Sequence, residues 1–445
     1  MWNLVGIVLL SISVQLLDGR PISTVPRSLI GLTEAPVLAS KVTPQTDPVA
    51  EQAVQTLIST LKQSGYSESQ QGVWLQTHDG ELLTSRLGTQ PLPVASLTKT
   101  ATTLAALQTW GSNYRFVTTI GTTGQIVGNT LQGDLIVQGS GDPFFVWEEA
   151  IALGNALNQM GIRRIQGNLV VTGKFYMNFE QSPQTSAALF KQAMDGGNWS
   201  DEVAAQYRTM PSGTAKPQVA ISGEIRVLPS LSPNLTNLQP LIRHNSLPLW
   251  QILKRMNTFS NNEMAEMLAA ELGGSRAVMQ AVIDSTGISP QEIYLINGSG
   301  LGQQNQISPH ATVAILIAVQ KKAQLEGLTL ADLLPISDCH CGTIDSRNLP
   351  AGSLVKTGTL SDVSTLAGVI QTRDRGPIWF AIINRGDGDI DFFHRVQDQV
   401  LRTLTLKWGQ PKPVLSALFS PTAWQDRDRN EILLMLSPAG FQKHK

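Results

Sequence analysis

The chain has 445 residues, a formal net charge of -1 and charged residues at only 15% of its positions. This length allows two or three domains with a large core, and 38 glycines with 24 prolines are typical of a folded, loop-rich protein rather than a disordered one. Because there is no excess of basic residues, we expect no nucleic-acid partner.

The N-terminal segment indicates export. Residues 4–17 are almost wholly apolar, a length that suits a signal-peptide core and is short for a membrane span. Residues 1–17 are therefore interpreted as a signal peptide, although no Lys or Arg precedes the apolar run and no small-x-small cleavage site follows it at once. An uncleaved anchor or a mis-assigned start codon would give the same pattern, and a loose membrane association is left open. Residues 18–48, rich in Pro, Thr and Ser, are expected to be a linker. We therefore expect a periplasmic or cell-envelope protein.

The first folded elements are predicted to be a helix and a strand hairpin. Apolar residues recur at three- and four-residue steps from position 49, and Ser59 and Lys62 fall on the polar side of that helix. Residues 73–77 and 82–83 then read as two strands joined around an Asp-Gly turn.

A second helix is predicted over residues 98–110, which are rich in Ala and Leu and are followed by Gly111. Ser96 therefore lies at or just inside a helix N-terminus. Unpaired backbone amides and the positive end of the helix dipole favour developing negative charge at that position.

Residues 116–244 differ in sequence pattern from the segments on either side and are interpreted as an inserted, mostly β domain. Strand-like runs at 135–137 and 168–171 alternate with glycine turns, and one helix is expected at 148–160. The turn at 139–143 lacks the third glycine and the following helix of a dinucleotide-binding motif.

The chain after the insert is predicted to begin with helices and to end with strands. Ser260 and Glu263 fit a capping box for a helix over 260–272, and Pro309 starts another helix. Antiparallel strands are expected at residues 354–360, 365–371 and 378–383, and a closing helix at 392–404. Residues 408–445 are expected to form a tail punctuated by prolines.

Three short motifs follow one another in the order Ser96-Leu97-Thr98-Lys99, Ser260-Asn261-Asn262 and Lys356-Thr357-Gly358. Only the third motif is unique. The Ser-x-x-Lys pattern also begins at Ser59 and Ser353, and the Ser-x-Asn pattern also begins at Ser232 and Ser346, so these four positions are decoys. The elements that carry the motifs, two helix starts and a strand, separate them from these decoys and predict one acyl-transfer active site.

The first motif supplies a nucleophile and its base. A serine hydroxyl must pass its proton to a neighbouring base before it attacks a carbonyl, and one helical turn places Lys99 beside Ser96. As a base, Lys99 needs a pKa lowered toward ~7 to 8 by burial or by a nearby positive charge. Lys356 is assigned as that charge, Ser260 as a proton relay and Asn262 as a hydrogen-bond partner of the substrate amide.

The Lys-Thr-Gly strand is expected to receive the substrate backbone along its edge. A side chain at Gly358 would stand where that backbone must approach, and the backbone amides of Ser96 and Thr359 are placed to hold the oxyanion. Lys356 and Thr357 would meet a substrate carboxylate, which implies a peptide with a free C-terminus.

Longer strings surround the motifs, at residues 93–99, 133–135, 141–143, 256–262, 297–301, 307–309 and 355–360. Spread over about residues 50–405, they resemble the class C low-molecular-mass penicillin-binding proteins, the D-alanyl-D-alanine carboxypeptidase/endopeptidase group of the penicillin-binding protein 4 type. The resemblance implies an α/β, transpeptidase/β-lactamase-like catalytic domain over 49–115 and 245–407, with an antiparallel sheet flanked by helices.

The same resemblance implies peptidoglycan stem peptides as substrates and β-lactams as covalent inhibitors. It also suggests Asp201 as the acidic residue for the free amine of the peptide's diamino acid. The stretch between Ser96 and Ser260 is shorter than the resemblance implies, so a third, nested domain is expected to be missing. Asn297 stands where an acidic residue is common. We expect neither a metal nor another cofactor.

Two alternatives stay open. A β-lactamase or esterase of the same superfamily would use the same nucleophile, although no convincing Glu-x-x-Leu-Asn segment is found and the second motif is not Tyr-x-Asn. The other alternative is a non-catalytic peptidoglycan-binding module, against which the intact motifs argue.

The two cysteines, Cys339 and Cys341, are separated by one residue. A disulfide between them would close a very small ring, and a metal site would need a further ligand. They are interpreted as packed thiols in a loop.

Overall fold

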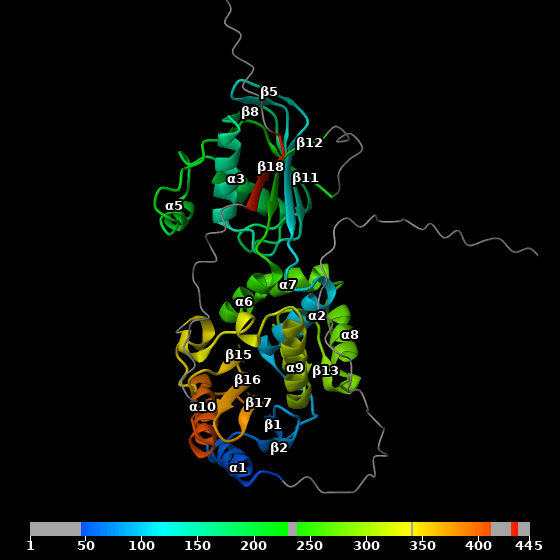
Figure 1. The fold of residues 1–445 in the computed structure, drawn as a ribbon, viewed down its shortest axis with the longest axis vertical. Coiled ribbons are helices and arrows are strands. Elements are labelled where there is room, and N and C mark those ends of the chain that lie inside the picture. The colour runs from blue at the N-terminus through cyan, green and yellow to red at the C-terminus, as the bar shows by residue number, and fades with distance from the viewer. Residues whose placement is uncertain (1–45, 230–237, 340, 411–428, 435–445) are drawn as a thin grey trace, which may run out of the picture. The chain divides into compact units, whose positions relative to one another are not determined.

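The computed structural model describes residues 46–229, 238–339, 341–410 and 429–434 (Figure 1). The predicted signal peptide or anchor and most of the predicted linker lie outside the described residues, as does most of the tail after position 410. Within the described ranges, no helix is both long and apolar enough to cross a membrane.

A five-stranded antiparallel sheet takes its strands from segments far apart in the sequence. The strand order is β15-β16-β17-β1-β2. β1 and β2 span Gln71–Thr77 and Leu82–Arg86, and β15, β16 and β17 span Leu354–Leu360, Val363–Thr372 and Gly376–Arg385. The predicted hairpin and the three predicted neighbouring strands are confirmed, and β17 joins the two sets by pairing with β1.

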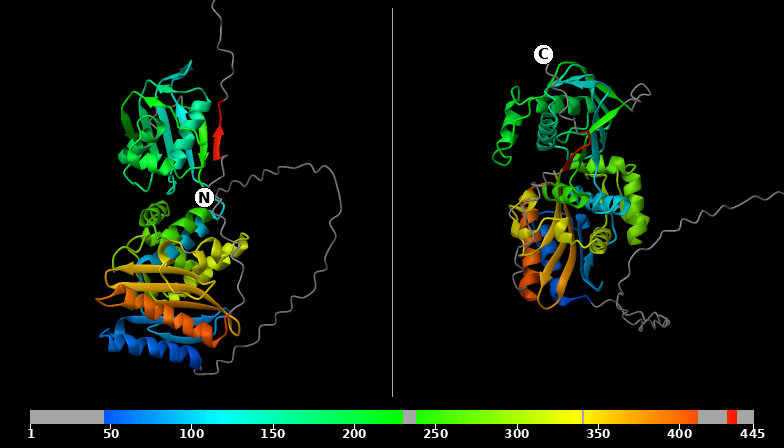
Figure 2. Two further views of the ribbon diagram at one scale, coloured as in Figure 1. Left: turned by 90° about the vertical axis from the view of Figure 1, so that its left-hand side faces the viewer. Right: turned by 45° about the horizontal axis from the view of Figure 1, so that its top comes forward.

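Helices cover both faces of this sheet (Figures 1 and 2). α1 (Pro48–Gln63) and α10 (Ile390–Lys407) lie along one face, and α9 (Pro309–Leu325) lies on the other. The side chains of β17 alternate between the two layers, since Phe380 belongs to the core under α1 and α10 whereas Ala381 belongs to the core around α9.

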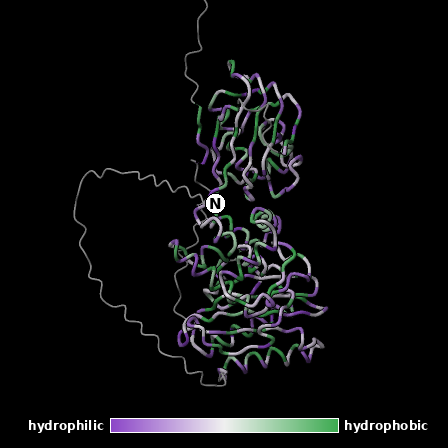
Figure 3. Tube along the Cα trace, turned by 90° about the vertical axis from the view of Figure 1, so that its right-hand side faces the viewer, coloured by the Kyte–Doolittle hydropathy of each residue, from purple (hydrophilic) through white to green (hydrophobic). Residues whose placement is uncertain are grey.

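Sequence polarity explains how α1 is placed. Leu57 and Leu61 are buried in the core, whereas Ser59 and Lys62 are exposed to solvent. The hydropathy-coloured trace shows the same alternation of hydrophobic and hydrophilic stretches along the described helices and strands (Figure 3). The Ser-x-x-Lys pattern of this helix is therefore a solvated helix face.

α2 (Thr98–Trp110) has the bounds that the sequence predicts and is buried on nearly all sides. Its small alanines allow close packing against several helices. Gly111 ends α2 with a φ of 75°, a conformation that glycine adopts without strain. Besides α9, the helices in contact with α2 are α6 (Leu249–Phe259), α7 (Asn262–Glu271) and α8 (Ser275–Thr286).

The predicted capping box of Ser260 and Glu263 is wrong. α7 begins at Asn262, and its cap is Asn261, whose side chain accepts a hydrogen bond from the backbone N–H of Met264 at 2.8 Å. Ser260 instead ends α6, with a left-handed φ of 54°. Asn caps a helix as well as Ser does, so the hydroxyl of Ser260 is not needed as a helix cap.

The strands and helices between residues 117 and 245 have a core of their own. One sheet has the strand order β11-β9-β7-β4-β12-β18, in which β18 is Asn430–Ile432, and a second has the order β10-β8-β6-β5. The strands are β4 (Val117–Thr122), β5 (Gln125–Val127), β6 (Thr130–Gln132), β7 (Leu135–Ser140), β8 (Arg164–Ile165), β9 (Leu169–Lys174), β10 (Ala220–Ile221), β11 (Ile225–Leu228) and β12 (Gln239–Asn245).

Three helices lie among these strands in the sequence: α3 (Trp147–Gln159), α4 (Pro183–Met194) and α5 (Asp201–Tyr207). The predicted strands at 135–137 and 168–171 and the predicted helix at 148–160 are confirmed as parts of β7, β9 and α3. The sequence does not predict α4 and α5, so the insert is richer in helix than expected.

Strand β18 (Asn430–Ile432) comes from the C-terminal tail and pairs antiparallel with β12. Next to it, the guanidinium of Arg429 forms an ion pair with the buried carboxylate of Glu149. The ring of His244 is hydrogen-bonded to the side chain of Asn430 at 2.7 Å. The tail therefore supplies an edge strand to the inserted sheet, which the sequence does not predict.

Candidate active site

Ser96 lies in a short 3-10 turn, Ala95–Leu97, that leads directly into α2. Ala95 has a left-handed φ of 48°, an unusual conformation for a residue other than glycine. Gly300 packs against this turn so closely that a Cβ atom on it would lie 1.9 Å from the carbonyl oxygen of Ala95. The Asn-Gly-Ser-Gly-Leu segment thus holds the strained turn that presents Ser96.

Lys99 reaches Ser96 as the motif predicts. Its Nζ lies 2.9 Å from Oγ of Ser96, 2.7 Å from Oδ1 of Asn262 and 2.8 Å from the carbonyl oxygen of Ser299. The side chain has no exposed surface. Burial lowers the pKa of Lys99 to about 7, against the opposing effect of the carboxylates of Glu266 and Glu263. A large fraction of Lys99 is therefore neutral and able to accept a proton near pH 7.

Glu266 of α7 is a supporting residue that the sequence analysis did not identify. Its carboxylate accepts hydrogen bonds from the backbone N–H groups of Gly298 at 3.2 Å and Ser299 at 3.0 Å. It thereby fixes the carbonyl of Ser299 that receives Lys99. Asn297, which stands where an acidic residue is common, accepts from the N–H of Gly300 at 2.9 Å.

The second and third motifs meet through Ser260 and Lys356. Nζ of Lys356 lies 3.0 Å from Oγ of Ser260 and 2.7 Å from the carbonyl oxygen of Thr357. Lys356 has no exposed surface, and burial followed by the nearby Lys99 lowers its pKa well below the usual value. The left-handed backbone of Ser260 turns its hydroxyl toward this lysine rather than toward α7.

The reason for glycine at position 358 differs from the prediction. A Cβ atom there would meet Oγ1 of Thr365 at 2.4 Å, the carbonyl oxygen of Val94 at 2.7 Å and the backbone nitrogen of Ser96 at 2.8 Å. The space is occupied by the turn that carries the nucleophile, not left for substrate. Gly358 therefore allows β15 to approach Ser96 closely.

A hollow of about 230 Å³ opens over these residues. It is lined by the predicted residues Ser96, Ser260, Thr357, Gly358 and Thr359, together with Thr343 and His394. The hydroxyls of Thr343 and Thr357 lie 2.6 Å apart. No motif marks Thr343, in the short 3-10 turn Gly342–Ile344, or His394, on α10, so the sequence carries no signal for either residue.

Asp201 is not among the residues that line this hollow. It is the exposed first residue of α5 in the inserted segment.

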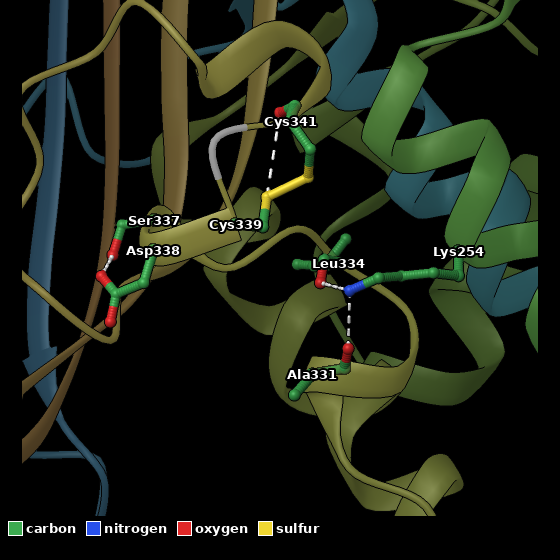
Figure 4. Close-up of a disulfide and its surroundings, with 7 residues drawn as sticks. All are labelled: Lys254, Ala331, Leu334, Ser337, Asp338, Cys339 and Cys341. Atoms are coloured by element: carbon green, nitrogen blue, oxygen red, sulfur yellow. Dashed lines mark hydrogen bonds between the residues drawn. A yellow bond between two sulfur atoms is a disulfide. The ribbon is translucent and has the colours of Figure 1, made fainter. Parts of the chain in front are cut away.

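Cys339 and Cys341 are joined by a disulfide (Figure 4), so the interpretation as two packed thiols is wrong. The bridge lies just before Gly342, where a Cβ atom would be 2.0 Å from the carbonyl oxygen of Thr258. The ring is feasible because one intervening residue still allows the two Cα atoms to stand 5.2 Å apart. The disulfide therefore constrains the loop that brings Thr343 to the site.

The fold and these paired Ser and Lys groups define a protein of the penicillin-recognising serine peptidase type. Residues 53–192 and 217–405 match the D-Ala-D-Ala carboxypeptidase 3 (S13) family, and the chain belongs to that family. It is accordingly a serine-type D-Ala-D-Ala carboxypeptidase. Asp201 falls in the stretch between the two matched segments.

Individual relatives are distant but cover most of the chain. Carboxypeptidase DacB of Mycolicibacterium smegmatis is 25% identical over 342 residues, which cover 67% of this chain and 72% of the relative. The predatory endopeptidase Bd3459 of Bdellovibrio bacteriovorus superposes with a TM-score of 0.67 at 24% identity, over 77% of this chain and 94% of that one. Penicillin-binding protein 4 of Haemophilus influenzae has a TM-score of 0.60 at 20% identity, over 80% and 99% of the two chains. These two structures show the shared fold.

Proposed function

We propose that Ser96 is the acylated nucleophile of a D-Ala-D-Ala carboxypeptidase/endopeptidase that acts on peptidoglycan stem peptides. The observation that carries this assignment is the 2.9 Å contact between Oγ of Ser96 and Nζ of a buried Lys99 whose pKa is lowered to about 7. A serine with such a base needs no further activation to attack a carbonyl.

In the acylation step, Oγ of Ser96 bonds to the carbonyl carbon of the terminal D-Ala peptide bond while its proton passes to Lys99. The carbon–nitrogen bond then breaks, and Lys99 returns its proton to the leaving amine through the hydroxyl of Ser260, which accepts a hydrogen bond from Lys356. Water attacks the resulting ester while its proton passes to Lys99, and Lys99 then returns this proton to Oγ of Ser96 as the peptide acid departs. The first of these transfers is between groups already in hydrogen-bond contact, Ser96 and Lys99.

The oxyanion is assigned to the backbone N–H groups of Ser96 and Thr359. The close approach of Gly358 to the nitrogen of Ser96 supports this pairing, because it brings β15 beside the nucleophile turn. A single donor of this kind typically contributes ~2.7 to 4 kcal/mol to transition-state stabilisation. Oδ1 of Asn262 is held by Lys99, which leaves its amide nitrogen to donate to a substrate carbonyl.

Recognition of the substrate carboxylate is assigned to Lys356, Thr357 and Thr359. Lys356 has a strongly lowered pKa in this structure, and an anion beside it would favour the protonated form again. Binding of the peptide C-terminus and protonation of Lys356 are therefore coupled. Asp201 stays proposed as a contact for the free amine of the diamino acid.

Covalent inhibition by β-lactams belongs to the same proposal. The Bd3459 structure from Bdellovibrio bacteriovorus is a penicillin G-acylated endopeptidase, and a β-lactam carbonyl offers Ser96 the same kind of target as the peptide. We further assign residues 49–115 and 245–407 to the catalytic domain and 116–244 to the insert. Export to the periplasm or cell envelope through residues 1–17 would place the enzyme beside its substrate.

The test is to incubate the purified protein with a labelled penicillin and to assay D-Ala release from a peptide ending in D-Ala-D-Ala. We expect one covalent adduct and D-Ala release, both lost in Ser96→Ala and both retained in the matched decoy variant Ser59→Ala. An adduct that survives Ser96→Ala would contradict the assignment. Rapid turnover of a chromogenic β-lactam without D-Ala release would favour a β-lactamase, and no adduct on the wild type would favour a binding module.

A further inference from the structure

The hollow at Ser96 does not end at the motifs. His394 also lines a second, larger groove of about 570 Å³ that runs between α10 and the segment after the disulfide loop. Other residues of this groove are Ser346, Asn348, Arg395, Asp398 and Arg402. His394 is the residue common to both, so the nucleophile and the groove lie on either side of one side chain.

The groove has the length of a short peptide. Its α10 residues run from Asp391 to Arg402, which corresponds to about 16 Å of helix at 1.5 Å per residue. An extended peptide covers this distance with about five residues. The groove is thus long enough for a stem peptide, and far longer than a single released amino acid needs.

The buried carboxylate of the groove already has a partner. Asp398 is held by the nearly fully buried guanidinium of Arg347 at 2.6 Å, whereas the side chain of Asp391 is largely exposed to solvent, 3.5 Å from the ring of His394. Arg395 pairs at the surface with Asp389 at 3.2 Å.

Arg402 is different, because its guanidinium donates to the neutral amide oxygen of Asn348. Among the described residues, no carboxylate lies within ion-pair distance of Arg402. Burial and the neighbouring Arg347 lower the pKa of His394, so its ring is neutral near pH 7 and contributes hydrogen bonds rather than charge. Arg402 is therefore the cation that the groove offers to an anionic ligand.

We propose that this groove along α10 is a leaving-group subsite that receives the carboxylate-bearing second stem peptide of a cross-linked substrate. The proposal rests on the acyl-transfer function assigned above and deepens it. His394 is a positioning residue between the hollow and the groove, and Arg402 pairs with a carboxylate of the leaving peptide. A free D-Ala leaving group is too short to reach Arg402, so the groove affects the endopeptidase reaction selectively.

The experiment compares two substrates in the full-length protein: a purified cross-linked muropeptide dimer and an uncross-linked pentapeptide. For Arg402→Gln we expect KM for the dimer to rise roughly two- to fivefold, the range of an exposed ion pair. D-Ala release from the pentapeptide and acylation by labelled penicillin should stay unchanged. Arg276→Gln, at an exposed arginine of α8, is the matched control and should alter neither substrate.

A second variant tests the groove by volume rather than charge. Ser346→Trp places a bulky ring at an exposed position of the groove and should slow dimer cleavage while leaving pentapeptide cleavage intact. Equal effects on both substrates, or no effect of either variant on the dimer, would overturn the subsite. Loss of penicillin acylation in the wild type would instead overturn the function on which the subsite rests.

Discussion

Lys99 is a fully buried amine that donates to a hydroxyl, an amide oxygen and a carbonyl oxygen. Lowering its pKa from 10.5 to about 7 corresponds to about 5 kcal/mol of unfavourable free energy. A whole domain is held by only ~5 to 15 kcal/mol, so a side chain of this cost is explained by chemistry rather than by packing.

Replacing Lys99 by Met should therefore separate activity from stability. We expect Lys99→Met to lose acylation by penicillin by at least 100-fold, in the range of general-base contributions, while its melting temperature stays equal or rises. Ser59→Ala, on the exposed face of α1, is the control variant and should keep both the acylation and the melting temperature of the wild type. A large drop in melting temperature would mean that Lys99 is mainly structural.

The pH dependence follows from the same group. Acylation needs neutral Lys99, so its rate should rise with pH around a midpoint near 7. Stability has the same sign: the unfolded lysine binds a proton between about pH 7 and 10.5 whereas the folded one does not, so the free energy of unfolding falls as pH falls across this window. Acylation rates from pH 5.5 to 9 check the first point. A rate that is flat over this range would remove Lys99 as the base.

At the scale of elements, the helices and strands show what the sequence can and cannot specify. α2 is predicted at both ends because Ser96 precedes it and Gly111 follows it. The start of α7 is missed because Ser260 and Asn261 are equally good caps by type. In the structure Asn261 caps the helix, and the hydroxyl of Ser260 contacts Lys356 instead. The five main catalytic candidates come together as predicted, whereas Thr343 and His394 depend on a loop and a helix face that no local pattern links to the site.

The disulfide loop yields a prediction of its own. Changing Cys339 and Cys341 together to Ser should loosen the loop that holds Thr343 against Thr357, and raise KM for a D-Ala-D-Ala peptide by roughly two- to fivefold, the loss of about one hydrogen bond. kcat should change less, because Ser96 and Lys99 are untouched.

Dithiothreitol provides the control for this variant. Treating the wild type should reproduce the rise in KM, and treating the double variant should have no further effect. An unchanged KM after verified reduction of the wild type would show that the loop keeps its position without the disulfide.

At the scale of the whole molecule, the C-terminal tail bears on the stability of the insert. Arg429 pairs with Glu149, a carboxylate that is only 3% exposed as a residue. Removing one partner of a buried ion pair typically costs about 3 to 5 kcal/mol, because the remaining charge is left uncompensated. We expect Arg429→Met to lower the thermal stability of the insert without abolishing penicillin acylation by the catalytic domain.

The matched test adds Glu149→Gln to Arg429→Met, because the glutamine removes the carboxylate charge that the first substitution leaves unpaired. The double variant should recover a large part of the lost stability in a thermal melt. If Arg429→Met alone melts like the wild type, the tail contributes nothing to the insert.

The motif-bearing half of the molecule could be predicted well because catalysis ties its residue types to short sequence patterns. The placement of β18 could not, since a three-residue strand such as Asn430–Ile432 has no periodicity to recognise. Its place in the sheet depends on β12, which lies far from it in the sequence. The same holds for the His394 groove, whose two sides are far from the nucleophile in sequence.

The tail strand also has a consequence for how the chain is made. β12 is synthesised well before β18, which is nearly the last described segment to emerge. β1 likewise waits for β17 to complete the five-stranded sheet. Neither sheet can be completed until strands that follow the last motif have been made, β17 for one and β18 for the other, and until then β1 and β12 each present an unpaired edge of the kind that templates aggregation. A chain that ends before β18 would therefore keep all three motifs and still leave the edge of β12 unpaired.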